Sequence, residues 1–358
     1  MSHYNLSFVG FGNVGQALAL LLRQKHEELK TRYDLTFTVT GIATGHHGMA
    51  INHDGINLEH ALSLVKEGKS LEILDAQFNT NTQSEDQSPF PSQPGRNPVL
   101  DFIRLSKANV LFENTPVNYQ TGQPAVEYLR TALELGMHAI TANKGPVVHA
   151  HQTLLTLAKT NGIQFLFEST VMDGAPIFSL FRCALPGARL LGFKGILNST
   201  TNMILTRMEN GESFGQAVAY TQSIGLAETD PSGDVDGWDS AIKIAALATV
   251  LMDIPFTPTQ IDRKGIRGIT SEDIARAKTS GKRWKLICSA HRHENTLEAH
   301  VAPEMVPASS PFYSVEGASS IIQFETDVLS ALTIIENDPG PQTTAYGLLA
   351  DFLNIARG

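Results

Sequence analysis

The chain has 358 residues, 42% of them hydrophobic, which is enough for two globular domains or one large domain. Its net charge of −9, from 36 acidic and 27 basic side chains with no basic cluster, makes a nucleic-acid partner improbable. No apolar run approaches the roughly 20 residues that cross a bilayer. The N-terminus lacks a secretion signal, and two distant cysteines predict neither a disulfide framework nor a zinc site, so a cytoplasmic protein without a membrane partner is expected.

Strands and helices alternate through the first 170 residues. Short β-rich and buried runs predict strands at 5–9, 35–43, 109–112, 138–141 and 164–168. Apolar residues at helical spacing predict helices at 14–32, 57–68, 123–135 and 152–160. This alternation predicts an α/β fold with a Rossmann-type, doubly wound parallel sheet that carries helices on both faces.

The rhythm changes after residue 170, where longer helices are interrupted by polar loops. Helices are expected at 177–185, 202–209, 214–224 and 240–251, followed by a strand at 329–335 and a closing helix at 344–356. We therefore predict a second, α+β domain over residues 166–338, while 1–165 and 339–358 form the first. Residues 77–98 are rich in Asn, Gln, Ser and Pro, and are predicted to form a mobile loop.

A G-x-G-x-x-G sequence joins the first expected strand to the first expected helix. Its glycines, Gly10, Gly12 and Gly15, allow another group to approach the backbone closely, and the N–H groups at the start of the helix attract phosphate. The turn therefore predicts a site for the pyrophosphate of a dinucleotide. The alternative interpretation is a tight turn between a strand and a helix that binds no ligand.

The second expected strand lacks, at its end, the acidic residue that binds the ribose 2′-hydroxyl in many dinucleotide sites. Thr44, Gly45, His46 and His47 occupy this place, and nothing there repels a 2′-phosphate. We therefore predict that NADP is used at least as well as NAD. The two histidines are expected to belong to the surface of a loop.

A polar segment at 227–244, AETDPSGDVDGWDSAIKI, leads into an apolar helix. Asp239 and Lys243 are four residues apart, so on a helix they share a face and can form an ion pair. Glu228 lies upstream on a loop broken by Pro and Gly, from which it can fold back over that face. Carboxylates that grip an ammonium, beside a lysine that reaches an oxygen, suit a small zwitterionic substrate. The alternative is a solvated loop and a helix whose acidic start is favoured by the helix dipole.

Ordered motifs along nearly the whole chain resemble those of homoserine dehydrogenase. They are GFGNVG at 10–15, ENTPVN at 113–118, TANKGP at 141–146, ESTVMDGAP at 168–176, GILNSTTN at 195–202, the segment at 227–244, and FETDVLSALTII at 324–335. The resemblance implies an NAD(P)-dependent oxidoreductase that reversibly reduces L-aspartate 4-semialdehyde to L-homoserine, in the biosynthesis of threonine and methionine. Two alternatives stay open: a dehydrogenase of another small amino acid or aldehyde, and a non-catalytic dinucleotide-binding sensor.

The resemblance also implies roles for individual residues. Glu228 would hold the substrate ammonium, Asp239 and Lys243 would form the catalytic pair, and Lys144 would be a second active-site lysine. Hydride that arrives at an aldehyde carbon leaves an alkoxide, which a nearby ammonium stabilises and then protonates. Without its motif, Lys144 would be interpreted as an ordinary solvated lysine. Further substrate-binding positions are Asp234, Asn198 and Thr200.

A cofactor site and a cation site follow from the same resemblance. The first predicted domain would bind the dinucleotide, and the second would bind the substrate and form a dimer. Cofactor-binding positions are Gly10, Gly12, Asn13, Val14, Gly15, Thr44, Asn114, Thr115, Pro116 and Lys144. A monovalent cation such as Na⁺ would be held, mostly by backbone carbonyls, at Glu168, Val171, Asp173 and Ala175. Oxygen ligands suit such a hard ion, and a plain structural turn is the alternative.

The chain departs from the family pattern at two places. Ser199 stands where the family usually has Gly, and residues 340–342, Gly-Pro-Gln, replace a glycine-rich turn that the family has beside the nicotinamide. The chain stops at Gly358 without the regulatory domain of many relatives, so threonine feedback through such a domain is not expected. A homodimer or a higher homo-oligomer is expected, with its interface around residues 165–176 and 305–338.

Overall fold

The computed structural model describes residues 1–75, 97–294 and 296–358. The predicted mobile loop at 77–98 lies outside the described residues except for its last two positions, Asn97 and Pro98, which begin helix α3 (Pro98–Leu105). Asn97 caps this helix, since its side-chain oxygen accepts a hydrogen bond from the Val99 N–H at 3.1 Å. The chain divides into two compact units, residues 1–174 with 341–358 (unit 1) and residues 175–340 (unit 2).

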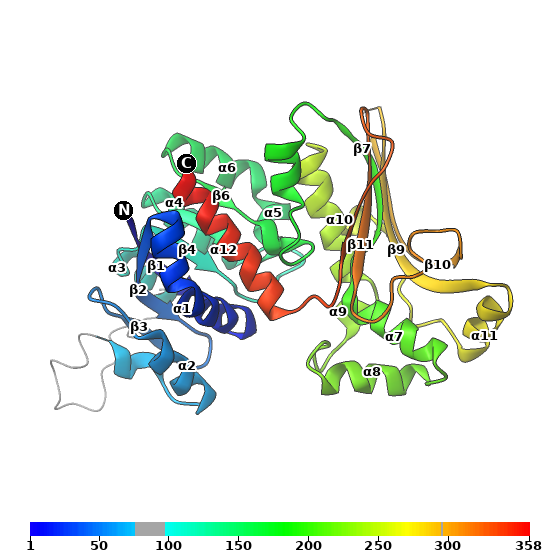
Figure 1. Ribbon diagram of the computed structural model, residues 1–358, viewed down its shortest axis with the longest axis horizontal. Helices are drawn as coiled ribbons and strands as arrows, with labels where there is room; N and C mark the ends of the chain where they lie inside the picture. Colours follow the sequence, from blue (N-terminus) through cyan, green and yellow to red (C-terminus); the bar gives the residue numbers. More distant parts are fainter. Residues whose placement is uncertain (76–96, 295) are drawn as a thin grey trace. The chain divides into compact units, whose positions relative to one another are not determined.

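The described part of unit 1 is built on a sheet of six strands in the order β3-β2-β1-β4-β5-β6 (Figure 1). The strands are β1 (Ser2–Val9), β2 (Leu35–Ala43), β3 (Met49–Ile51), β4 (Val110–Glu113), β5 (His138–Thr141) and β6 (Phe165–Leu166). All neighbours pair in parallel except β2 and β3, which form an antiparallel hairpin. The predicted doubly wound parallel sheet is therefore confirmed, with one antiparallel strand added at its edge.

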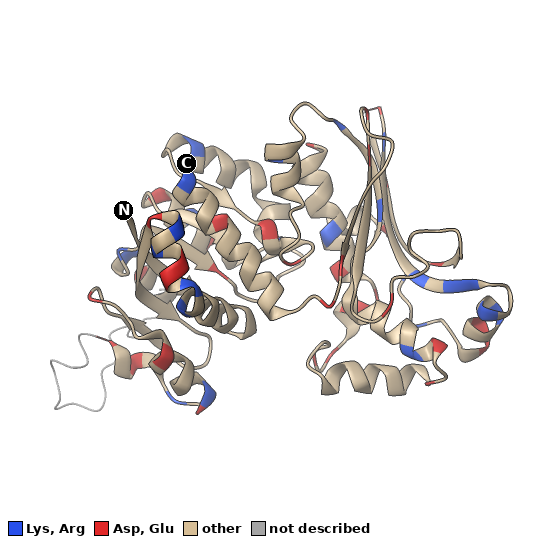
Figure 2. Ribbon diagram, in the orientation of Figure 1, with Lys and Arg blue, Asp and Glu red and all other residues tan. Residues whose placement is uncertain are grey.

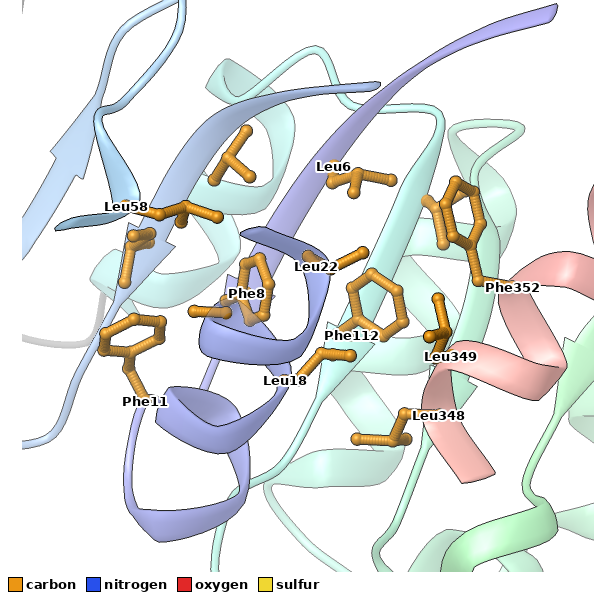
Figure 3. Packing of buried hydrophobic residues seen from close by; sticks show 14 of the residues in the cluster. Leu6, Phe8, Phe11, Leu18, Leu22, Leu58, Phe112, Leu348, Leu349 and Phe352 are labelled. Carbon is orange, nitrogen blue, oxygen red and sulfur yellow. The ribbon is translucent and has the colours of Figure 1, made fainter. Parts of the chain in front are cut away.

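Helices cover both faces of this sheet. Alternate residues of β1 point to opposite faces, so Leu6 and Phe8 pack with α1 and α12, while Val9 packs with α3 and α4. Figure 3 shows Phe8 and Phe112 of the strands in contact with leucines of α1 and α12. The helices of unit 1 besides α3 are α1 (Asn13–Tyr33), α2 (Leu58–Lys66), α4 (Ala125–Glu134), α5 (Lys144–His149), α6 (His151–Thr160) and α12 (Pro341–Arg357).

Unit 1 extends past the domain boundary that we expected between residues 165 and 166. The expected strand at 164–168 ends at Leu166, and a 3₁₀ turn, η3 (Glu168–Thr170), follows it. The Ser169 hydroxyl in this turn donates a hydrogen bond to the Thr344 carbonyl of α12 at 2.7 Å. The backbone also passes so close to Gly347 that an added Cβ there would lie 2.8 Å from the Asp173 carbonyl oxygen. These contacts attach residues 168–174 to α12 and hence to unit 1.

Unit 2 is built on a second sheet, whose six described strands have the order β12-β11-β7-β9-β10-β8. The strands are β7 (Leu190–Ile196), β8 (Asp262–Arg263), β9 (Lys282–His293), β10 (Thr296–Pro307), β11 (Ser320–Thr326) and β12 (Leu332–Glu336). Neighbouring strands are antiparallel except for β8 and β10. The unit has the α+β character that we predicted, but of its strands the sequence located only β12, which it placed at 329–335, starting three residues too early.

The helices of unit 2 agree more closely with the prediction. They are α7 (Ser199–Glu209), α8 (Phe214–Ser223), α9 (Ser232–Val235), α10 (Trp238–Leu251) and α11 (Ser271–Thr279). The helix expected at 177–185 is a short π-helix at Leu180–Ala184, and α9 and α11 were not predicted. Figure 2 shows acidic and basic residues interspersed along α1 and α11, without a basic stripe. Among the described helices, none has the length and apolar character that crossing a bilayer requires.

Candidate functional site

The glycine turn of unit 1 lies where β1 ends and α1 begins. Gly10 has φ +93, and a Cβ there would lie 2.5 Å from the backbone carbonyl carbon of Asn114, so only glycine fits this position. A Cβ at Gly15 would lie 2.6 Å from the Gly10 oxygen. At Gly12, by contrast, an added Cβ would meet no described atom within 4 Å. The turn is therefore tightly packed against the protein at Gly10 and Gly15, and its backbone is open to a ligand at Gly12.

The carboxyl ends of four neighbouring strands meet at this turn. Val9 pairs with Ala43 of β2 and with Glu113 of β4, and Glu113 pairs in turn with Thr141 of β5. Helix α1, between β1 and β2, lies on one face of the sheet, whereas α3, before β4, and α4, after it, lie on the other, and β4 is added on the side of β1 opposite to β2. In open α/β sheets such a switch point is where ligands bind.

The segment after β4 carries an unsatisfied amide. Neither the oxygen nor the nitrogen of the Asn114 side chain is exposed, and neither has a hydrogen-bond partner in the described parts of the chain. A buried polar group without a partner costs free energy, so it indicates a position at which a ligand can supply the missing hydrogen bonds. The adjacent Thr115 is partly buried and Pro116 is exposed.

The remaining cofactor positions surround the same strand ends. Asn13 and Val14 open α1, Asn13 exposed and Val14 partly buried. The Thr44 hydroxyl donates to the Gly48 carbonyl at 3.0 Å and accepts from the His47 N–H at 2.6 Å. The turn after β2 therefore uses the Thr44 hydroxyl itself, and it presents no carboxylate to a ligand. Lys144 is the first residue of α5, directly after the capping residue Asn143.

The centre of the candidate site in unit 2 is an ion pair on α10. The Lys243 Nζ lies 3.2 Å from the Asp239 Oδ2, and the two side chains are only 14% and 12% exposed. The ammonium also donates a hydrogen bond to the backbone oxygen of Leu197, just after β7. The spacing of four residues therefore gives the predicted pair, and the end of β7 fixes its position.

Asn198 connects this pair to a second carboxylate. Its Nδ2 donates to Asp234 Oδ1 at 2.7 Å and to Asp239 Oδ2 at 3.0 Å. Its Oδ1 accepts from the Thr201 N–H at 2.8 Å, so Asn198 also caps α7. Both ends of the amide are thus engaged within the protein. Asn198 thus holds two carboxylates side by side, and its role as a substrate ligand stays a prediction.

Asp234 carries an electrostatic penalty in this arrangement. Burial raises the pKa of its carboxyl, and the neighbouring Asp239 carboxylate raises it further. Hydrogen bonds from Asn198 and Thr200 act in the opposite direction, as does the charge of Lys243. A buried carboxylate with a raised pKa is typical of functional sites, where the charge serves a ligand rather than stability.

Replacing Asp234 by asparagine is therefore expected to raise the Tm at neutral pH. Asparagine keeps an oxygen that accepts from Asn198 but has no charge. The carboxyl of Asp234 ionises less readily in the folded chain than in the unfolded chain, so its ionisation destabilises the native state as pH rises from about 4 through the raised folded pKa. Calorimetry of both proteins checks this. The gain in Tm should disappear toward about pH 4, and an equal gain at every pH would contradict the assignment.

Thr200 and Glu228 stand at the edge of this group. Thr200 is buried, and its hydroxyl donates to the Leu226 carbonyl at 3.2 Å, which attaches α7 to the loop before Glu228. Gln222 holds the same loop by donating to the Glu228 backbone oxygen at 3.2 Å. The side chain of Glu228 is exposed. The structure therefore brings together Asn198, Thr200, Asp234, Asp239 and Lys243, and leaves the Glu228 carboxylate on the adjoining surface.

The positions expected to hold a cation lie at the boundary of the two units. Glu168, Val171 and Asp173 belong to unit 1, and Ala175 is the first residue of unit 2. Asp173 has φ +40, and its carboxylate accepts from the Thr343 hydroxyl at 3.1 Å. In the described parts of the chain, no three His, Cys, Asp or Glu side chains are grouped to hold a metal ion. A monovalent cation held here mostly by backbone carbonyls stays a prediction.

Sequence reasoning missed two polar residues beside the predicted cofactor positions. Glu113 is fully buried at the end of β4, and its carboxylate binds both Thr115 and Thr141. Asn143 caps α5 and donates to the Thr115 carbonyl at 3.1 Å. Both lie inside the motifs ENTPVN and TANKGP. The sequence did contain a signal, because Glu113 is an acidic residue at the end of an otherwise apolar strand. A carboxylate can be buried there only if hydrogen-bond donors surround it.

The known proteins that resemble this chain in sequence and those that resemble it in structure belong to the same family. The sequence profile of the family described as homoserine dehydrogenase matches residues 176–353. The chain is 34% identical over 356 residues to the NAD(+)-dependent homoserine dehydrogenase of Pseudomonas canavaninivorans, which covers 99% of this chain and 97% of that protein. It is 34% identical over 352 residues to the homoserine dehydrogenase of Methanocaldococcus jannaschii, with 98% of each covered.

A solved structure agrees with these relatives. The crystal structure of a homoserine dehydrogenase from Thiobacillus denitrificans has a TM-score of 0.79 at 26% sequence identity, and the match covers 100% of this chain and 74% of that chain. Sequence and structure thus agree, and the chain belongs to the homoserine dehydrogenase family.

Proposed function

We propose that the protein catalyses the reversible, NAD(P)-dependent reduction of L-aspartate 4-semialdehyde to L-homoserine. The observation that carries this proposal is the largely buried Asp239–Lys243 ion pair, held beside Asp234 by a single amide, in a chain of the homoserine dehydrogenase family. An ammonium paired with one carboxylate, and a second carboxylate bonded to the same amide, suit an amino-acid substrate whose oxygen changes charge during the reaction.

Unit 1 is proposed as the dinucleotide-binding domain. Gly12 offers open backbone at the start of α1, Gly10 and Gly15 shape the turn, and the buried amide of Asn114 lacks partners of its own in the described chain. These features fit a pyrophosphate and a polar ring substituent. A bound nicotinamide supplies or accepts the hydride. The other positions proposed to contact the dinucleotide are Asn13, Val14, Thr44, Thr115, Pro116 and Lys144.

Lys243 is proposed to act on the reacting oxygen. Its ammonium stabilises the negative charge that develops on that oxygen during reduction and donates a proton to it, which leaves the neutral amine; in the reverse direction the neutral amine takes that proton from the hydroxyl and becomes the ammonium again. Asp239 keeps Lys243 protonated and oriented, and Asn198 prevents Asp239 from turning away. Asp234 and Glu228 are proposed to bind the ammonium of the amino acid. Lys144 is proposed as a second cationic group in the same reaction.

Oxidation of homoserine tests the activity directly. With NAD or NADP present, the proposal expects an increase in absorbance of the reduced cofactor that depends on homoserine. Turnover confined to other amino acids or short aldehydes would replace the proposal by another dehydrogenase activity. Tight dinucleotide binding without turnover of any of them would indicate a sensor.

The cofactor preference is a separate prediction. The turn after β2 presents Thr44, Gly45, His46 and His47, and Thr44 uses its hydroxyl within the turn. No carboxylate there selects the 2′-hydroxyl or repels a 2′-phosphate, so kcat/KM for NADP is expected to equal or exceed that for NAD. Steady-state rates with both cofactors at saturating homoserine measure the ratio. A strong preference for NAD would mean that the selection depends on a feature outside this turn.

A monovalent cation such as Na⁺ is proposed to bind the backbone oxygens at Glu168, Val171, Asp173 and Ala175. Support comes from the left-handed backbone at Asp173, which turns successive carbonyls in different directions. Its function would be to stiffen the connection from unit 1 into unit 2. Homoserine oxidation in Na⁺, K⁺ and tetramethylammonium buffers tests the site, and identical rates in all three would exclude it.

The protein is also proposed to be a homodimer or a higher homo-oligomer. Four hydrophobic side chains between residues 305 and 338 are at least 39% exposed: Met305, Val328, Leu329 and Ile335. Met305 lies on β10, whereas Ile335 lies on the edge strand β12 and Val328 and Leu329 lie in the loop before it, where exposed apolar residues indicate contact with another protein surface. The other expected segment, 165–176, is largely buried within the described structure and exposes little surface. Sedimentation of the native protein and of an Ile335→Glu variant tests the assignment, and a monomeric native protein would refute it.

A further inference from the structure

A fully buried carboxylate lies where β4 and β5 end. Glu113 Oε1 accepts hydrogen bonds from the Thr115 N–H, at 2.8 Å, and from the Thr115 hydroxyl. Its Oε2 accepts from the Thr141 hydroxyl at 2.7 Å. None of these donors carries a charge. Burying a carboxylate against neutral donors is costly, and an apolar side chain of similar size would fill the same space without that cost. The carboxylate therefore contributes something that packing does not.

The contribution is the connection of two loops. The Thr141 hydroxyl, which donates to Glu113, also accepts from the Asn143 N–H at 2.9 Å. The Asn143 side chain closes the circuit, because its Nδ2 donates to the Thr115 carbonyl at 3.1 Å. Glu113 thus fixes the loop after β4 and the loop after β5 at the same time. The side chains that make these bonds, Glu113, Thr141 and Asn143, are themselves buried, so the backbone of both loops has little freedom to move.

The circuit ends at the residue before Lys144. Asn143 Oδ1 accepts from the Gly145 N–H at 2.9 Å, so the backbone on both sides of Lys144 is held by one side chain. A catalytic group must be kept close to its productive geometry, and a displacement of about 1 Å can lower a rate by about a hundredfold. Hydrogen bonds that fix the backbone of Lys144 can therefore influence catalysis without touching the reactants.

We propose that Glu113, through Thr141 and Asn143, is a positioning residue that sets Lys144 for its part in the reaction. The inference rests on the proposed function, in which Lys144 is a cationic group of the active site. It adds a residue that acts through another, since Glu113 is fully buried and its hydrogen bonds go to the protein.

Substitution of Thr141 tests the connection with the least disturbance, because it leaves the bonds between Glu113 and Thr115 in place. Thr141→Val has nearly the same shape but removes the hydroxyl, so it should lower kcat for homoserine oxidation by about tenfold or more. Thr141→Ser keeps the hydroxyl and should stay within about twofold of the native enzyme. NADH affinity, measured by fluorescence titration, should change little in either variant, since the Thr115 loop keeps Glu113 as its partner.

A double-mutant cycle with Lys144→Ala separates positioning from a merely structural effect. If Thr141 acts through Lys144, then Thr141→Val should lower kcat in the native background and have no further effect in the Lys144→Ala background. An equal loss in both backgrounds would overturn the proposal, as would a failure of Thr141→Ser to preserve the rate. If Lys144→Ala alone left kcat unchanged, the role of Lys144 in the proposed function would fail together with the positioning role.

A spectroscopic measurement on the enzyme without cofactor gives independent information. After ¹³C-methylation of lysines, the resonance of Lys144 is assigned by its loss in Lys144→Ala. Its chemical shift should move in Thr141→Val and stay in place in Thr141→Ser. An unmoved resonance in both variants would show that the circuit does not control the surroundings of Lys144, and would overturn the proposal whatever the kinetic result.

Discussion

Lys243→Met is expected to lower kcat for homoserine oxidation by about a hundredfold or more, the range found when one partner of a developing oxyanion is removed. Methionine keeps the length and apolar stem of lysine but has no ammonium. The reacting oxygen would then lose both its electrostatic partner and its proton donor. Steady-state kinetics measure the effect, and near-normal turnover would remove Lys243 from the chemistry.

Loss of activity in this variant must be separated from loss of stability. Without Lys243, the Asp239 carboxylate is left buried beside Asp234, which destabilises the fold. The double variant Asp239→Asn/Lys243→Met removes both charges of the ion pair, so it should recover much of the Tm while kcat stays low. Recovery of kcat together with Tm would mean that the lysine serves the fold alone. Lys278→Ala, an exposed lysine on α11, is the matched control.

Lys144→Ala is expected to lower kcat to a similar extent, by about a hundredfold or more, with little change in Tm. The backbone of Lys144 is held by Asn143, whose side-chain bonds to the Thr115 carbonyl and the Gly145 N–H do not involve the lysine side chain. The substitution therefore removes an ammonium without dismantling the loop. Affinity for NADH, measured by fluorescence, is expected to survive.

An isotope effect identifies the step that Lys144 serves. If the variant slows the chemical step, homoserine deuterated at the carbinol carbon should show a larger deuterium effect on kcat in Lys144→Ala than in the native enzyme. An unchanged isotope effect with a lowered kcat would place the lysine in a binding or release step. Lys159→Ala, at the exposed end of α6, is the matched control in the same unit.

The fold of unit 1 could be predicted because local signals there agree with one another. Predicted strands at 35–43 and 138–141 have the bounds of β2 and β5, and the glycine turn lies between β1 and α1 as expected. Parallel strands buried on both faces are short apolar runs, and helices of ordinary length separate them. Each element is specified by neighbours in the sequence, which is the condition under which such reasoning works.

Most strands of the unit 2 sheet could not be located from the sequence because their side chains are buried unevenly. In β10, for example, Ala299 and Val301 are buried while Glu298 is exposed, and the strand includes two prolines. Prolines and charged residues argue against a strand when only the sequence is read. The pairing partner that makes β10 stable is β9, and the polar side chains lie on the face that the unit leaves open.

The candidate site was predicted in its residue types but only partly in its connections. The four-residue spacing of Asp239 and Lys243 predicted their ion pair directly. No local pattern could show that Asn198 bonds to both Asp234 and Asp239, which lie 36 and 41 residues away. The circuit from Glu113 to Asn143 is likewise formed by tertiary contacts between two strand ends.

The return of the chain to unit 1 through α12 determines the order in which the two units can be completed during synthesis. Leu348 and Phe352 of α12 are fully buried in the core of unit 1, packed with residues of β1 and β4. These side chains leave the ribosome after every residue of unit 2, and domains generally fold as units during translation. Unit 2, although second in the sequence, is thus the first unit to be synthesised completely. The core of unit 1 beneath the glycine turn is complete only when α12 has been synthesised.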